Sequence, residues 1–470
     1  MRLPESGSLR VSRRLLWASL LLGSMLSLAV SCRLAMQSLV LGSREGNWVY
    51  GYFGTFNGRP VEVFLIATVF AAGLLLVSWF LLPPTGPPHA LKSIEWPLVF
   101  AWCLVGLALQ GMLRSLTPFS FRDIFASDGA NSFYTVALRY DAGTILRDFD
   151  HLRPSWPLHA QSNLPGKLLL VRSLTHITSS PAGLAWLIVG ISNLGGALLY
   201  LFTRDLFESR RVALLSLVLY LFMPAKLFFF PLLNTVTPVA VLACSCLLLR
   251  WLATGRPVYA ALFGAAIYGL MLFEPGSLVA GLLFAALMAR ALWRGDIASD
   301  VLAQQTGIGV ATFAATYVAM AVWFGFGLAS ALRGVGADAA RFNLAAARPY
   351  GIWVRQNLID FLFGVGVCQV VALPAALADG LVTKAPVQSR LTTPIVVVCL
   401  TVAGMLAAVD LIGVNRGEVI RLWIFLGCLF QIPAAYVCAR LDSRAAAVLV
   451  VGTTLLQDAL GSSMVGFIVP

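Results

Sequence analysis

Long apolar runs, separated by short polar segments, follow one another along almost the whole chain. A helix needs about 20 apolar residues to cross the hydrocarbon core of a bilayer, and about thirteen runs approach that length. They lie near residues 15–36, 61–82, 96–113, 182–202, 212–230, 234–252, 257–273, 276–293, 303–326, 357–378, 393–412, 422–439 and 444–461. This pattern predicts an all-α polytopic membrane protein with about thirteen transmembrane helices, joined by external loops and short interfacial helices.

Composition narrows the class of protein further. Hydrophobic residues make up 59% of the 470 residues and charged residues only 11%, whereas soluble proteins carry roughly 25% charged residues. A water-soluble fold is therefore excluded. The net charge is +12, but the basic residues lie at predicted helix ends and in loops, so we expect no nucleic-acid partner. The eight cysteines have neither C-x-x-C spacing nor histidine partners, and support no disulfide framework or zinc site.

The distribution of lysine and arginine predicts the orientation. Short cytoplasmic loops of membrane proteins are rich in both residues, and every predicted inner loop is basic if the N-terminus is cytoplasmic. The inner groups are Arg2 to Arg14, Lys92, Arg204, Arg210, Arg211, Arg250, Arg256, Arg290, Arg294, Lys384, Arg390, Arg440 and Arg444. This orientation requires that the short, charge-interrupted segment 164–178 does not cross the membrane. If that segment does cross, every later loop changes sides.

The predicted external side holds most of the distinctive polar residues. Its longest parts are the loops 114–181 and 327–356. Charged residues near the predicted external helix ends follow the same bias, namely Glu62, Lys226, Glu274, Asp360, Asp410 and Asp458. Because a charge inside a membrane span is costly and usually functional, this clustering indicates chemistry at one surface of the membrane.

Two carboxylates stand in the loop 114–181, just after the third predicted helix. Asp123 and Asp128 are candidates for a general base that deprotonates an acceptor hydroxyl, and Asp128 is the preferred one. The alternative is a solvated loop whose aspartates cap short helices. Ser127-Asp128-Gly129 is an ordinary turn or N-cap sequence, which keeps that alternative open.

The same loop continues into a candidate binding segment. His159, Asn163 and Lys167 surround a Pro-Gly break, which predicts the start of a short amphipathic helix after it. Lys167 could meet a phosphate near the first turn of that helix, where free backbone N–H groups also favour anions. His159 is a binding candidate only, since a lone loop histidine is more often a structural hydrogen-bonding residue.

Arginines recur with aromatic residues in the remaining external segments. Arg348 and Arg355 belong to the loop 327–356, and the turn that follows a later span carries Arg416, Glu418 and Arg421. Such residues suit a lipid phosphate and a sugar ring. They suit an aromatic belt with anionic lipid headgroups equally well, and the Arg–Glu pair also suits a contact that joins two helix ends.

Together these motifs resemble the GT-C superfamily of membrane glycosyltransferases over roughly residues 91–470, which leaves 1–90 as an added N-terminal transmembrane hairpin. Asp128-Gly129 with Tyr134 is similar to the acidic signature of the first external loop of that superfamily. Residues 159–166 resemble the His-Pro-Pro-like stretch that follows, and the turn 415–423 resembles an Arg-Gly-Glu-Val segment of bacterial members. The chain departs from the pattern because it lacks the proline pair and a second acidic residue beside Asp128. These departures leave the base and the metal dependence open.

The resemblance implies transfer of a sugar from a polyprenyl-phosphate donor to a glycan, lipid or protein acceptor. The reaction would take place on the non-cytoplasmic face of a bacterial inner membrane. Asp128 would be the base, and the departing lipid phosphate would be stabilised by cations among Lys167, Arg348, Arg355, Arg416 and Arg421. The residues support no metal ion, other cofactor or nucleotide-binding loop. A transporter or flippase for a lipid or glycan is the alternative, although that class usually places ionisable residues near the bilayer midplane.

Overall fold

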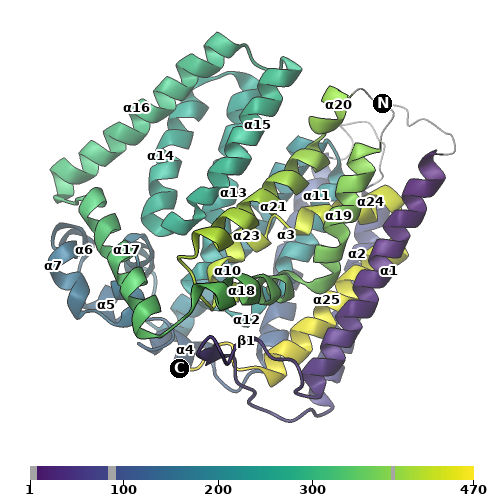
Figure 1. Ribbon diagram of the computed structural model, residues 1–470, viewed down its shortest axis with the longest axis horizontal. Coiled ribbons are helices and arrows are strands. Elements are labelled where there is room, and N and C mark those ends of the chain that lie inside the picture. Colours follow the sequence, from purple (N-terminus) through teal and green to yellow (C-terminus); the bar gives the residue numbers. More distant parts are fainter. Residues whose placement is uncertain (1–7, 83–91, 383–386) are drawn as a thin grey trace.

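The computed structural model describes residues 8–82, 92–382 and 387–470, and these are almost entirely helical (Figure 1). Their one sheet is the antiparallel pair β1 (Gly42–Ser43) and β2 (Trp48–Val49). Eleven segments are long and apolar enough to span a membrane. These are α1 (Ser8–Ala35), α2 (Arg59–Leu81), α3 (Lys92–Arg114), α10 (Pro181–Phe207), α11 (Arg210–Leu221) with α12 (Pro224–Phe228), η2 (Leu233–Val236) with α13 (Thr237–Thr254), η3 (Pro275–Ala280) with α15 (Gly281–Arg294), α16 (Ser299–Phe324), α21 (Pro394–Ile412), α23 (Ile424–Gly427) with α24 (Gln431–Leu441), and α25 (Arg444–Met464). The predicted all-α polytopic membrane protein is thus confirmed.

Two of the predicted spans have a different form. The run 257–273 becomes α14 (Pro257–Phe273), a 17-residue apolar helix. The run 357–378 becomes two helices, α18 (Tyr350–Val365) and α19 (Val367–Leu381), which meet at 97°. The break lies at Gly366, whose φ of 108° is open only to glycine, and the Gln369 side chain fills the space that a Cβ would take. A straight span at 357–378 is therefore ruled out by the backbone.

The two long external segments are built from short helices rather than open loops. Residues 114–181 form α4 (Phe121–Ala126), α5 (Phe133–Arg139), α6 (Ala142–Arg147), α7 (Phe149–Leu152), η1 (Arg153–Ser155), α8 (Leu158–Gln161) and α9 (Gly166–Leu174). Because α9 has nine residues, it extends for roughly 14 Å and cannot cross the bilayer, as the predicted orientation requires. The segment 327–356 holds the 18-residue α17 (Leu328–Ala345). The remaining helices are the short α20 (Val387–Leu391) and α22 (Val419–Leu422).

The helices pack into one bundle, from which α14, α15 and α16 extend as an arm (Figure 1). Both α1 and α2 pack against α25, so the segment predicted as an N-terminal hairpin contacts the last helix of the chain. Along α16 the side chains are mostly exposed; Trp323 is 75% exposed. Apolar exposure of this kind is expected where lipid rather than water surrounds a helix.

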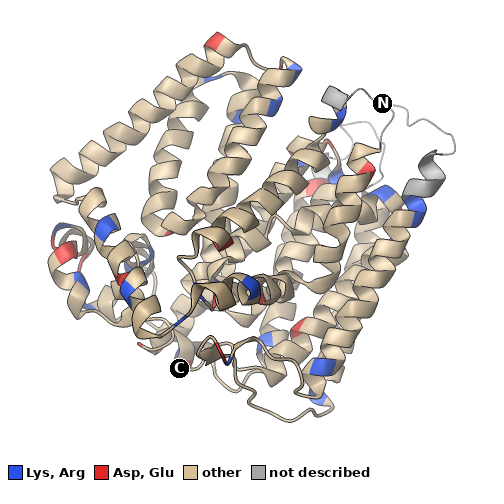
Figure 2. Ribbon diagram, viewed as in Figure 1, with Lys and Arg blue, Asp and Glu red and all other residues tan. Residues whose placement is uncertain are grey.

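Charged residues collect at the two ends of the bundle, and its middle is mostly uncharged (Figure 2). At one end, residues predicted to be cytoplasmic meet: Arg204 and Arg210 both pair with Glu95, and Arg250 pairs with Asp205 at 3.1 Å. Arg2 and Lys384, which belong to the same prediction, lie outside the described residues.

The segments predicted to be external meet at the other end. Asp360 accepts from Gly42 N at 3.0 Å, and Asn47 donates to Ala347 O at 2.7 Å. The C-terminal segment is there as well, since Phe53 N donates to Met464 O. One end of the bundle thus gathers the segments that carry the candidate site residues. Which compartment this end faces stays a prediction.

Candidate functional site

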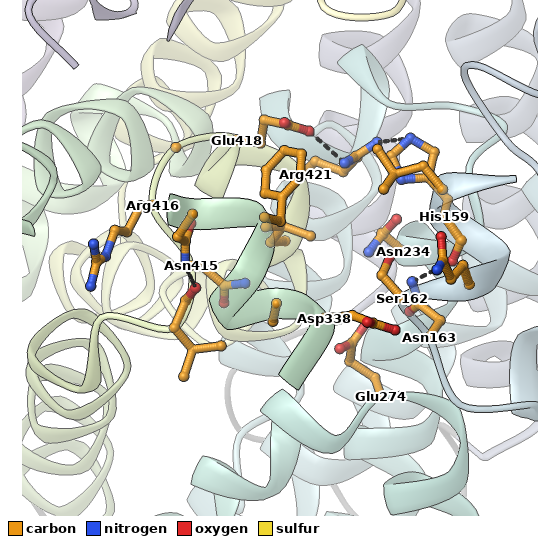
Figure 3. Close-up of a pocket in the computed structure, with 18 of the residues that line it drawn as sticks. His159, Ser162, Asn163, Asn234, Glu274, Asp338, Asn415, Arg416, Glu418 and Arg421 are labelled. Carbon is orange, nitrogen blue, oxygen red and sulfur yellow. Dashed lines mark hydrogen bonds and ion pairs between the residues drawn. The ribbon is translucent and has the colours of Figure 1, made fainter. Parts of the chain in front are cut away.

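A cavity of about 610 Å³ opens at the end where the predicted external segments meet. Segments far apart in the sequence form its walls. They are residues 130–163, η2, Glu274 after the end of α14, α17, Arg348 and the turn 414–422. Figure 3 shows Glu418, Arg421 and His159 in a row along one side, with Glu274 and Asp338 on another. The cavity is therefore a product of the tertiary fold.

Of the ten predicted site residues, six line this cavity. They are His159, Asn163, Arg348, Arg416, Glu418 and Arg421. The other four, Asp123, Asp128, Lys167 and Arg355, are not part of its lining. The structure thus brings the predicted cations of two segments together with the predicted histidine, but it does not bring the predicted base into the same wall.

The turn before α22 has a conformation that few residues tolerate. Gly417 and Glu418 have φ values of 87° and 59°, both in the left-handed region. Asn357 on α18 holds this turn with its amide: it donates to Asn415 O at 2.9 Å and accepts from Gly417 N at 3.1 Å. Asn343 on α17 donates to Val414 O at 2.8 Å. Two neighbouring helices therefore fix the backbone that presents Glu418.

Glu418 joins two arginines into one buried cluster. Its carboxylate lies 3.3 Å from Arg348 and 2.5 Å from Arg421. Burial raises the pKa of Glu418, but Arg421 and Arg348 outweigh burial and hold that pKa below its ordinary value. The Nε groups of both arginines are buried without a hydrogen-bond partner. The cluster carries a net positive charge, which suits an anionic ligand.

Arg416 lies beside this cluster but is oriented differently. It exchanges hydrogen bonds with Arg348, since Arg348 donates to Arg416 O at 2.7 Å and Arg416 donates to Arg348 O at 2.9 Å. Its guanidinium also lies over the Tyr350 ring, and in Figure 3 it points away from the other labelled residues. Arg416 thus braces the turn and adds positive charge close to the cavity.

His159 connects α8 to the turn. Its Nε2 lies 3.4 Å from a guanidinium nitrogen of Arg421 (Figure 3). Burial and the Arg421 charge both hold the pKa of His159 far below its ordinary value. The imidazole is therefore neutral and can accept a hydrogen bond from Arg421, which fits a binding or positioning role.

Carboxylates on the opposite wall are each paired with a cation. Glu274 lies 2.6 Å from Lys167, which is 1% exposed and also donates to Asn163 at 2.8 Å. Asp338 pairs with Arg153 and Arg341. Lys167 is thus neutralised behind the cavity wall rather than presented to a ligand, and Glu274 and Asp338 offer acceptor oxygens to the cavity.

The remaining predicted residues lie on the surface. Asp123 forms a capping box at the start of α4, where it accepts from Ser120 Oγ at 2.6 Å; the capping alternative is therefore confirmed for this residue. Asp128 is exposed and accepts from Thr135 Oγ at 2.5 Å. It stands two residues before Ala130, which lines the cavity. Arg355 is exposed on α18.

Several contributors to the site are not among the ten predicted site residues. Asn343 and Asn357 hold the turn, while Asn234 and Asp338 line the cavity. The sequence feature that could have identified them is a polar residue in or beside an apolar run, as at Asn357. Within the described residues, no group of three His, Cys, Asp or Glu side chains is placed to hold a metal ion.

Neither models of known protein families nor the sequences of curated proteins give a match to this chain.

Proposed function

We propose that the protein is a glycosyltransferase that moves a sugar from a polyprenyl-phosphate donor to an acceptor on the non-cytoplasmic face of the membrane. The observation that carries this proposal is the cavity at one end of the bundle, where Arg348 and Arg421 share the single carboxylate of Glu418. Guanidinium groups recognise phosphate oxygens with two parallel hydrogen bonds, and a site level with the ends of the spans is open to a lipid-borne phosphate.

The size and the polarity of the cavity support a small glycosyl group. Its volume of about 610 Å³ falls within the roughly 300–1,000 Å³ of small-molecule sites. Asn131, Gln161 and Asn234 line it beside the carboxylates of Glu274 and Asp338. Amide groups and carboxylates together provide both the donors and the acceptors that sugar hydroxyls need.

The proposed reaction needs two groups of the protein: cations that stabilise the leaving phosphate and a base that takes the acceptor proton. An acceptor hydroxyl oxygen attacks the anomeric carbon, the bond from that carbon to the phosphate oxygen breaks, and the electron pair leaves with the lipid phosphate. Arg421 and Arg348 stabilise the negative charge that develops there. Asp128, which is exposed two residues before the cavity-lining Ala130, takes the acceptor proton.

The test is a transfer assay with purified protein and a panel of polyprenyl-phosphate sugars. We expect Asp128→Asn to lower turnover roughly a hundredfold or more, the usual contribution of a general base. Asp150→Asn is the matched control, because Asp150 is another exposed aspartate of the same external segment. Equal turnover of Asp128→Asn and wild type would remove Asp128 as the base. No transfer from any donor would remove the proposed function.

The alternative, a transporter or flippase, is favoured by two observations. The helices α18 and α19 are broken at 97°, and Lys226 and Asp458 are fully buried within spans. Broken helices and intramembrane ionisable residues are typical of transport pathways. Movement of a fluorescent polyprenyl phosphate between the leaflets of proteoliposomes, without sugar transfer, would support this class instead.

A further inference from the structure

A second cavity, of about 430 Å³, lies at the outer ends of α3 and α10. Its lining includes Arg114, Ser120, Phe121, Arg122 and Trp186, and it shares no lining residue with the first cavity. The span of α3 ends at Arg114 and that of α10 begins at Pro181. The cavity is therefore level with the membrane surface, where lipid headgroups lie.

Arg114 is the unusual residue of this cavity. It is 6% exposed, and its Nε donates a hydrogen bond to Phe230 O at 3.1 Å. Across the described ranges it takes part in no ion pair. Burying a guanidinium without a counter-charge costs free energy. An anion in the adjoining cavity would supply the missing partner.

Two further arginines lie around this second cavity, and its lining contains no carboxylate. Arg122 is exposed at the rim, and Arg59 reaches the same place, with NH2 3.4 Å from Ser115 O. The nearest carboxylate along the chain is Asp123, which is held by Ser120 in the capping box of α4. Three arginines therefore surround a space whose own lining holds no acid.

The wall formed by α10 is apolar and aromatic. Trp186 is 45% exposed, and its ring meets that of Phe121 edge-on with centroids 4.9 Å apart. Tryptophan is typical of the interface between lipid and water. A cationic rim above an aromatic wall matches a lipid, which has a charged headgroup joined to apolar chains.

We propose that this second cavity binds the phosphate group of an anionic phospholipid. Arg114 and Arg122 contact the phosphate oxygens, and Trp186 packs beside the upper part of the acyl chains. This site stands apart from the proposed transfer reaction, because none of its lining residues lines the first cavity.

The experiment compares lipid binding by purified full-length protein with native mass spectrometry, using phosphatidylglycerol and phosphatidylcholine as probes. We expect wild type to retain phosphatidylglycerol preferentially. Arg122→Gln should weaken its binding roughly tenfold, the effect of losing one charge-assisted hydrogen bond. Arg114→Gln should weaken it further. Arg139→Gln is the matched control, since Arg139 is exposed at the same end but belongs to neither cavity.

Two results would overturn the proposal. One is equal retention of the two phospholipids, and the other is unchanged phosphatidylglycerol binding by Arg122→Gln. Because Arg114 also donates to Phe230, Arg122→Gln carries the test if Arg114→Gln does not fold. Inorganic phosphate is added in a third arm: displacement of the lipid by phosphate alone would assign the site to a free anion rather than to a phospholipid.

Discussion

Glu418 keeps two buried guanidinium groups close together that would otherwise repel each other. Its carboxylate contacts both Arg348 and Arg421, and it is mostly buried itself. Removing one member of such a cluster leaves the others without a counter-charge, which costs about 3 kcal/mol or more. We therefore predict that Glu418→Gln lowers the thermal unfolding temperature in detergent. Glu45→Gln is the control, because Glu45 is an exposed glutamate at the same end, and it should leave the unfolding temperature unchanged. An unchanged unfolding temperature in Glu418→Gln as well would show that Glu418 has no structural role.

His159 makes the stability of the protein depend on pH. Its pKa in the folded protein lies below the ordinary value of 6.5, because it is buried beside Arg421. Below pH 6.5 the unfolded chain therefore binds a proton that the folded protein does not, so stability is lost as the pH falls. The lowered pKa of Glu418 acts in the same direction at more acidic pH.

The expected result is a lower unfolding temperature at about pH 5 than at about pH 7. In His159→Gln this difference should shrink, because glutamine does not titrate and still offers an oxygen to Arg421. Thermal unfolding of both proteins at the two pH values measures the effect. An unchanged pH dependence in the variant would show that other groups cause the loss.

At the scale of elements, the break between α18 and α19 depends on one glycine. Gly366 has a φ of 108° and contacts the Gln369 side chain where a Cβ would stand. We predict that Gly366→Ala destabilises the protein by about 1–3 kcal/mol, the usual cost of a strained backbone conformation. Gly404→Ala is the control, since Gly404 is an exposed glycine within α21 and has open space around it. Equal unfolding temperatures for the two variants would contradict this role of Gly366.

Apolar runs predicted the spans well because a bilayer requires length and hydrophobicity, and both are visible in the sequence. They could not reveal the bend at Gly366, since hydropathy carries no information on backbone direction. The helix α17 was missed for a related reason. Its sequence has no long apolar run, and it is held by buried contacts of Leu328 and Ala331 with the short helices of residues 121–174.

The candidate site was predictable in its residue types but not in its geometry. Arginines, a glutamate and a histidine at one surface were visible as a pattern, and six predicted residues line one cavity. Which of them touch depends on assembly of the whole bundle: His159 and Arg421 are 262 positions apart in the chain. The burial of Lys167 against Glu274 likewise follows from how α9 packs against the end of α14.

At the scale of the whole molecule, charge and topology agree. The residues predicted to be cytoplasmic meet at one end of the bundle and those predicted to be external meet at the other (Figure 2). Such a division is expected when successive spans cross a bilayer, and the assignment of one end to the cytoplasm stays a prediction of the positive-inside rule. Both cavities lie at the end of the bundle that this rule predicts to be external.

The first and last helices give this orientation a direct consequence. The start of α1 lies near the end of α24, where Arg13 donates to Leu441 O, whereas Gly466 N bonds to Gly51 O at the opposite end (Figure 1). An odd number of crossings must separate them. With the orientation predicted from the sequence, a fluorescent protein fused before Met1 should fluoresce in the cytoplasm of a bacterial expression host, and alkaline phosphatase fused after Pro470 should be active outside it. If only one of the two reporters is active, the two termini share a compartment, and one segment counted as a crossing turns back instead.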